Sequence, residues 1–235
     1  MARAHKGSLL FAVLLLISAA YSGAFIYRTS FVIDGERYFS LFDDAMVSMR
    51  YASNLANGHG LVWNLTDGPV EGFTNPLWTL YMTLPHLLPI APSKRSLFVQ
   101  VTSALLLLAN LYFVKRIADD LSDGSVPVSL SAVGLTAFYL PINNWSLQGM
   151  EVGLLTLLVS IATWEAIRCL RTGQFALRVY IVLALATLVR PDMVVPFVAT
   201  WAFLVAASPG RARQHLFTGL LILAASAFGQ TALRL

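Results

Sequence analysis

The chain has 235 residues, of which 57% are hydrophobic and only 12% are charged, whereas soluble domains carry about 25% charged residues. This composition excludes an ordinary water-soluble domain and predicts an all-α membrane protein, built as a bundle of several transmembrane helices. The formal net charge of +4 gives no reason to expect nucleic acid as a partner, because Lys and Arg in a membrane protein report its orientation in the lipid bilayer.

The first element is an apolar run at residues 8–27, which follows the basic start MARAHKG. About 20 apolar residues are enough to cross the hydrocarbon layer as a helix. The small residues of SAAYSGA leave a cleaved signal peptide open as an alternative. Because the run is long for such a peptide, we predict a retained first transmembrane helix.

Residues 28–74 are too polar to cross the membrane and are predicted to form an outer loop that contains a short amphipathic helix. One face of that helix is apolar and the other polar: Ala45, Met49, Ala52, Leu55 and Ala56 share the first, and Arg50, Ser53, Asn54 and Asn57 share the second. Gly58 is expected to end it. Such a helix is expected to lie on the membrane surface with its apolar face down.

Two adjacent acids, Asp43 and Asp44, stand where this helix begins. Asp43 is suited to the N-cap and Asp44 to the first turn, where a carboxylate accepts from unpaired N–H groups and suits the helix dipole. The alternative is that the pair does chemistry. Helix rules alone leave both interpretations open.

Further apolar segments lie near 75–90, 97–114, 126–142, 152–167, 179–207 and 216–233. If 75–90 stays in the interface or re-enters, nine of the sixteen basic residues face the cytoplasm: Arg3, Lys6, Lys115, Arg116, Arg168, Arg171, Arg178, Arg211 and Arg213. If it crosses, the cytoplasmic set is Arg3, Lys6, Lys94, Arg95 and Arg190. The positive-inside rule favours the first arrangement, which places 28–74 and the loop 143–151 on the same, outer side.

Segment 179–207 is too long for one untilted span and too short for two. Its break is predicted at Arg190-Pro191-Asp192, because proline removes a donor and disfavours helix at the residue before it. Broken helices at membrane depth need protein or a wet cavity around them. We therefore expect Arg190 and Asp192 at the floor of an outward-facing cavity.

Several polar and aromatic residues of the outer side are further candidates for binding. Trp63, Trp78 and Tyr81 fit either an aromatic belt at the interface or stacking against a sugar. Glu151 begins a predicted helix and fits either a dipole-favoured acid or a site residue. Arg190 is costly at depth, so it is expected to pair with Asp192 or Glu151, or to bind an anion such as a phosphate.

No metal site is expected. His59 and His86 have no Cys or His partners at zinc-ligand spacing. The single cysteine, Cys169, excludes an internal disulfide and is interpreted as a small packing residue.

Five short motifs succeed one another after the first transmembrane helix. They are an acidic pair and a VWN-ending run in DDAMVSMRYASNLANGHGLVWN, then VEGFTNPLW, the GME of QGMEVGLL, and the RPD of LVRPD. In this order they resemble the polyprenyl-phosphate-dependent glycosyltransferases of the GT-C superfamily, and most of all the branch with terminal arabinofuranosyltransferases of bacterial cell walls. The resemblance covers about residues 40 to 235.

The resemblance implies a GT-C-like fold and an inverting transfer of a sugar from a polyprenyl-phosphate donor to a glycan or lipid acceptor of the cell envelope. It places the protein in the bacterial plasma membrane with the site on the periplasmic or extracellular side. Arabinofuranose is the sugar that the branch suggests; other pentoses and hexoses stay open. A divalent cation is allowed but not implied.

The resemblance also assigns roles. Asp43, with Asp44 beside it, is the expected general base, the carboxylate that takes the proton of the acceptor hydroxyl. Independently of the resemblance, the charge of Arg190 is suited to the leaving lipid phosphate. The full set of expected substrate-binding residues is Arg50, Glu71, Asn75, Trp78, Glu151 and Arg190.

Members of the family are usually much longer than this chain. We therefore expect residues 1–235 to be the N-terminal transmembrane module of such an enzyme, completed by a C-terminal remainder and not fully active alone. Two other functions stay open: a transporter or flippase of lipid-linked or small solutes, since broken helices and a buried Arg also fit that class, and a non-catalytic GT-C-like subunit.

Overall fold

A computed structural model describes residues 2–66, 70 and 72–232, and the side chains from Lys6 onward. Most of these residues are helical. The helices are α1 (Ala2–Arg28), α2 (Asp43–Ala56), α3 (Pro76–Met82), α4 (Leu84–Leu87), α5 (Pro92–Leu121), α6 (Val126–Ala137), α7 (Leu140–Leu147), α8 (Val152–Thr172), α9 (Leu177–Val189), α10 (Val194–Ala207) and α11 (Ala212–Ala232), with short 3-10 turns at Pro191–Met193 and Pro209–Arg211.

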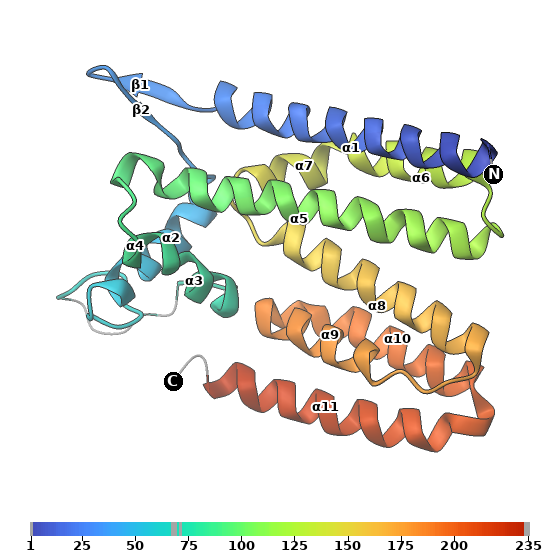
Figure 1. Cartoon of the computed structure of the whole chain (residues 1–235). Helices are drawn as coiled ribbons and strands as arrows, with labels where there is room; N and C mark the ends of the chain where they lie inside the picture. Colours follow the sequence, from blue (N-terminus) through green and yellow to red (C-terminus); the bar gives the residue numbers. More distant parts are fainter. Residues whose placement is uncertain (1, 67–69, 71, 233–235) are drawn as a thin grey trace.

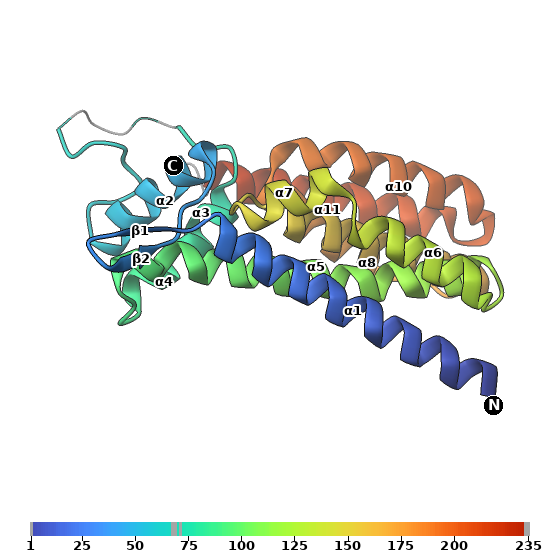
Figure 2. The same ribbon diagram turned by 90° about the horizontal axis from the view of Figure 1, so that it is seen from above.

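Four helical stretches are long and apolar enough to cross a membrane: Lys6–Arg28, Pro92–Leu121, Val152–Thr172 and Pro209–Ala232. α6 and α7 together pass the same test, but they are bent by 49° at the break between them. The described part of the chain is therefore an all-α membrane bundle with four or five such helices. Figure 2 shows α1 at its edge, diverging from the other helices toward its N-terminal end.

The segment near 75–90 forms two short helices, α3 with 7 residues and α4 with 4. At about 1.5 Å per residue neither approaches the length of a span. The chain therefore enters α5 from the end of the bundle at which α1 finishes (Figure 1). This geometry agrees with the first of the two arrangements, in which residues 75–90 do not cross the membrane.

Because residues 75–90 do not run the length of the bundle, its two ends differ in composition. Of the fourteen Lys and Arg residues whose side chains the structure describes, eight lie toward the end with the N-terminus: Lys6, Lys115, Arg116, Arg168, Arg171, Arg178, Arg211 and Arg213. The other end carries α2, α3, α4 and the residues that precede α8. Residues 28–74 and 143–151, which were predicted to share one side of the membrane, meet at this end of the bundle, where the Phe42 N–H donates to the Gln148 carbonyl at 2.9 Å.

Segment 179–207 is broken where the sequence predicts. Arg190 has extended backbone (φ −145°, ψ 131°) between α9 and the 3-10 turn at Pro191–Met193. The two helices have 13 and 14 residues and run antiparallel, so the segment enters and leaves at the basic end (Figure 1). Its turn brings Arg190 to the start of α8.

The connection between α1 and α2 contains an element that was not predicted from the sequence. Strands β1 (Phe31–Ile33) and β2 (Glu36–Tyr38) pair antiparallel. The connecting residues Asp34 and Gly35 both have positive φ, 50° and 79°. This is the Asp-Gly signal of a two-residue hairpin turn, and it was present in the sequence FVIDGERY.

Candidate functional site

The acidic pair lies in the first turn of α2, which begins at Asp43. The N-cap residue is Phe42 and has no side-chain cap, so the prediction of Asp43 as N-cap is wrong by one position. An Asp43 carboxylate oxygen instead accepts from the Asp44 N–H at 3.0 Å. Both acids are exposed, and in the first turn both still suit the dipole.

α2 is amphipathic as predicted, but its apolar face is covered by protein. Ala45, Met49 and Ala52 are buried in one cluster with Trp78 and Met82 of α3. The expectation that this helix rests on a lipid surface is therefore not met, because α3 and the bundle occupy that face. The contact fixes the direction in which the polar residues of α2 point.

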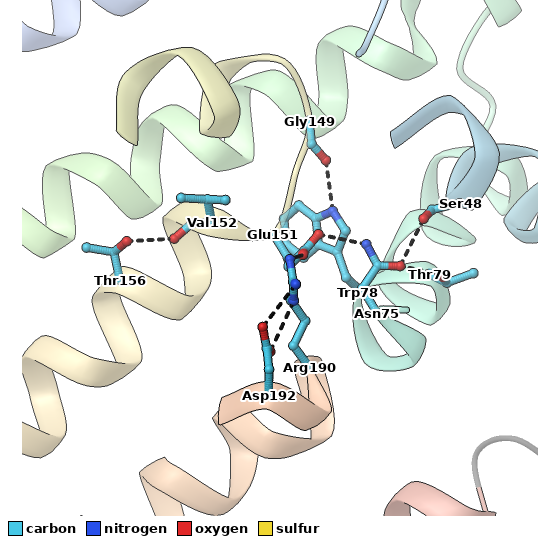
Figure 3. A network of polar contacts seen from close by, with 10 residues as sticks. All are labelled: Ser48, Asn75, Trp78, Thr79, Gly149, Glu151, Val152, Thr156, Arg190 and Asp192. Carbon is cyan, nitrogen blue, oxygen red and sulfur yellow. Dashed lines mark hydrogen bonds and ion pairs between the residues drawn. The ribbon is translucent and has the colours of Figure 1, made fainter. Parts of the chain in front are cut away.

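A buried chain of polar contacts starts beside this helix (Figure 3). The Asn75 amide nitrogen donates to Glu151 at 2.7 Å, and its oxygen accepts from Ser48 at 2.9 Å and from Thr79 at 3.0 Å. Asn75 is 3% exposed and Glu151 is 0% exposed. Because a carboxylate has no donor, Glu151 fixes the orientation of the Asn75 amide.

Arg190 continues this chain from the break between α9 and α10. Its Nη1 donates to Glu151 at 2.9 Å, and its Nη2 and Nε donate to Asp192 at 3.0 and 3.2 Å. Both partners expected for Arg190 are thus present. The contacts within the described residues occupy three of the five guanidinium N–H groups, which leaves two for a ligand.

A cavity of about 240 Å³ adjoins this network. Asp44 and Ser48 of α2 form one wall, residues 72–75 form another, and Arg190 with Met150 closes a third. The cavity therefore joins one acid of the pair, a buried amide and a guanidinium. Asp43 and Asp192 are not part of the lining; Asp192 instead holds Arg190 from its outer side, with 60% of its side chain exposed.

The other expected binding residues lie elsewhere. Trp78 is 2% exposed, stacks on Tyr81 with ring centroids 4.7 Å apart, and donates its indole N–H to the Gly149 carbonyl at 2.9 Å. Its ring faces are packed in protein, so they do not form a platform for a sugar. This burial also removes Trp78 from any aromatic belt.

Arg50 is exposed on the far side of α2. Its Nε donates to the Trp63 carbonyl at 2.8 Å, and its guanidinium lies 4.7 Å from the centre of the Trp63 ring. Arg50 therefore holds the following loop and does not line the cavity. Glu71 lies outside the described residues.

Two contributors were missed from the sequence, Ser48 and Thr79. Ser48 stands four residues after Asp44, so the helical period places both on one face, and this spacing was readable. Thr79 shares its face of α3 with Asn75 in the same way. Neither residue belongs to a motif that draws attention by itself.

Among residues 2–66, 70 and 72–232, no group of three or more His, Cys, Asp or Glu side chains is placed to hold a metal ion. Comparison of the chain with protein-family models, curated proteins and solved structures finds no match. The residues of the site and the motif order are therefore the basis on which a function can be inferred.

Proposed function

We propose that the chain is a membrane glycosyltransferase of the GT-C type that moves a sugar from a polyprenyl-phosphate donor to a cell-envelope acceptor on the outer face of the membrane. The observation that carries this proposal is the cavity that Asp44 and Arg190 line together. A carboxylate and a guanidinium on one cavity are the two groups that a transfer from a lipid phosphate requires.

In the proposed reaction the acceptor hydroxyl attacks the anomeric carbon of the donor. Its proton passes to a carboxylate, the new glycosidic bond forms, and the bond from the anomeric carbon to the phosphate oxygen breaks. The polyprenyl phosphate departs with the electron pair, and the two remaining N–H groups of Arg190 are suited to its charge. Direct displacement inverts the anomeric configuration.

Asp44 is the better candidate for the base in this arrangement, although the resemblance to the family assigns that role to Asp43. Only Asp44 contributes to the cavity wall. Glu151 and Asp192 both pair with Arg190, and Asp44 lines the same cavity, so three carboxylates and one guanidinium lie at this end of the bundle. An excess of negative charge suits a transition state in which the anomeric carbon becomes positive.

The test is transfer from radiolabelled polyprenyl-phosphate sugars in membranes of cells that express the chain from its own locus. We expect Asp44→Asn to lower transfer by about 10²- to 10⁴-fold, the usual contribution of general base catalysis, with insertion unchanged. Asp43→Asn is the matched control and is expected to retain most activity. If Asp43→Asn loses transfer and Asp44→Asn retains it, Asp43 is the base. If both variants retain normal transfer, neither acid of the pair is the base.

The antiparallel helices α9 and α10 with Arg190 at their turn also fit a transporter, because such half-helices form substrate sites in that class. The same membranes separate the two functions. A transporter moves labelled lipid-linked sugar between vesicle leaflets without forming a glycosidic product. Running the transfer assay with and without EDTA tests whether the reaction requires the divalent cation that the resemblance allows.

A further inference from the structure

A second cavity, of about 390 Å³, lies at the basic end of the bundle, opposite the candidate site. Its walls come from the last turns of α8, the connection 173–176 and the first turns of α9. The helix α8 is one of those that could cross the membrane, and it ends at Thr172. Its last turn and the first turn of α9 lie at the same end of the bundle as the N-terminus (Figure 1).

The charged groups of this cavity are Glu165, Arg168 and Arg178. Glu165 is nearly buried, and each guanidinium lies 3.8 Å from its carboxylate, which is an ion pair beyond hydrogen-bond distance. No hydrogen bond of either guanidinium occurs within the described part of the chain. The formal charges of two arginines and one glutamate, +2 − 1 = +1, match a ligand with one negative charge.

The backbone of α9 adds to this positive character. Its N-cap is Ala176, which provides no side-chain cap, and its first turn contains no acid. Ala176, Leu177 and Arg178 all belong to the cavity wall. The first N–H groups of a helix lack intrahelical partners and carry the positive end of its dipole, so an anion in the cavity would meet them as well as the arginines.

An exposed apolar stripe continues from the cavity along α9. Leu177 and Ile181 line the cavity and are 46% and 47% exposed, and Leu185, one turn further, is 42% exposed. The spacing of four residues keeps all three on one side of the helix. A ligand bound here would have a charged group among the arginines and an apolar part along this stripe.

From this juxtaposition we propose that the cavity is a binding site for an anionic glycerophospholipid. The singly charged phosphodiester would lie between Arg168, Arg178 and the start of α9, and one acyl chain would follow Leu177, Ile181 and Leu185. Basic pockets between helices at a membrane boundary are suited to such headgroups. The proposal does not depend on glycosyl transfer.

The test is native mass spectrometry of the purified chain during titration with phosphatidylglycerol or phosphatidylcholine of the same acyl composition. We expect the first phosphatidylglycerol to bind at least fivefold more tightly than phosphatidylcholine. Arg178→Gln, whose side chain is 80% exposed and which should fold normally, is expected to weaken it about fivefold, from roughly 1 kcal/mol per basic residue near an anionic lipid. Arg168→Gln should have a similar effect.

Two further variants test the proposal: one is a control that should leave lipid binding unchanged, and the other should strengthen it. Arg213→Gln removes the same charge from an exposed position at the same end that is outside the cavity, and it should leave binding unchanged. Glu165→Gln raises the formal charge of the cavity to +2 and should strengthen binding.

Equal binding of the two lipids, equal losses in Arg178→Gln and Arg213→Gln, or weaker binding in Glu165→Gln would each overturn the proposal. Displacement of the lipid by millimolar inorganic phosphate would do so too, because the apolar stripe would then contribute nothing.

Discussion

Glu151→Ala is expected to be the most damaging single change at the candidate site. Glu151 is fully buried and accepts from both Asn75 and Arg190. Removing one partner of a buried ion pair costs about 3–5 kcal/mol, but the Arg190 side chain is 32% exposed, so solvent reduces that figure to about 2 kcal/mol. The Asn75 amide left without an acceptor adds about 1 kcal/mol, which gives about 3 kcal/mol in total.

The chain contains a matched control for this prediction. Asp192 also accepts from Arg190, at 3.0 Å, but its side chain is 60% exposed, so Asp192→Ala should cost less than about 1 kcal/mol. Glu151→Gln should lie between the two, since a Gln side chain has one acceptor oxygen for two donors unless the Asn75 amide turns over. Equilibrium unfolding in mixed micelles measures all three. Equal losses of unfolding free energy in Glu151→Ala and Asp192→Ala would refute the reasoning that the buried Glu151 carboxylate contributes more stability than the exposed Asp192.

Two further predictions concern stability away from the site. A Cβ on Gly219 would clash with the indole ring of Trp201, so Gly219→Ala should destabilise the chain by about 1–3 kcal/mol. Gly134→Ala, with no atom within 4 Å of its Cβ, should be neutral or stabilise by up to about 1 kcal/mol. Similar unfolding midpoints of the two variants would contradict this. The pKa of His86 is lowered by burial and by the charge of Arg95, so unfolded chains bind the proton more readily. Stability should therefore be full above pH 6.5, the ordinary value, and fall as the pH drops below it; His86→Gln should reduce this dependence, and an unchanged pH profile would count against it.

The helical bundle could be predicted from hydropathy because a membrane span needs a long apolar run, and such runs mark α1, α5, α8 and α11. Pro191 marked the break in 179–207 because proline cannot continue the hydrogen-bond ladder. What hydropathy could not supply was the path of 75–90. Its composition is apolar enough for a span, and only the short α3 and α4, with Pro76 and Pro85 at their starts, exclude one.

The burial of Trp78 illustrates a different limit of the sequence. An aromatic residue in a polar, motif-rich stretch fits a sugar platform, a membrane belt and a packed core equally well. The choice depends on whether a partner for the indole N–H is near, and that partner, the Gly149 carbonyl, is 71 residues away. Contacts of this separation leave no periodic signal, so local reasoning could not decide among the three.

The choice between Asp43 and Asp44, in contrast, was within reach of the sequence. Ala45, Met49 and Ala52 define the inward side of α2, and successive residues turn by about 100°. Asp44 lies about 100° from Ala45, on the side of Ser48, while Asp43 lies about 200° away, beside Arg50. An acid diametrically opposite the buried face cannot line a cavity that the helix forms with its neighbours. The phase of the apolar pattern therefore indicates that Asp44, and not Asp43, lies on the side of α2 that lines the cavity.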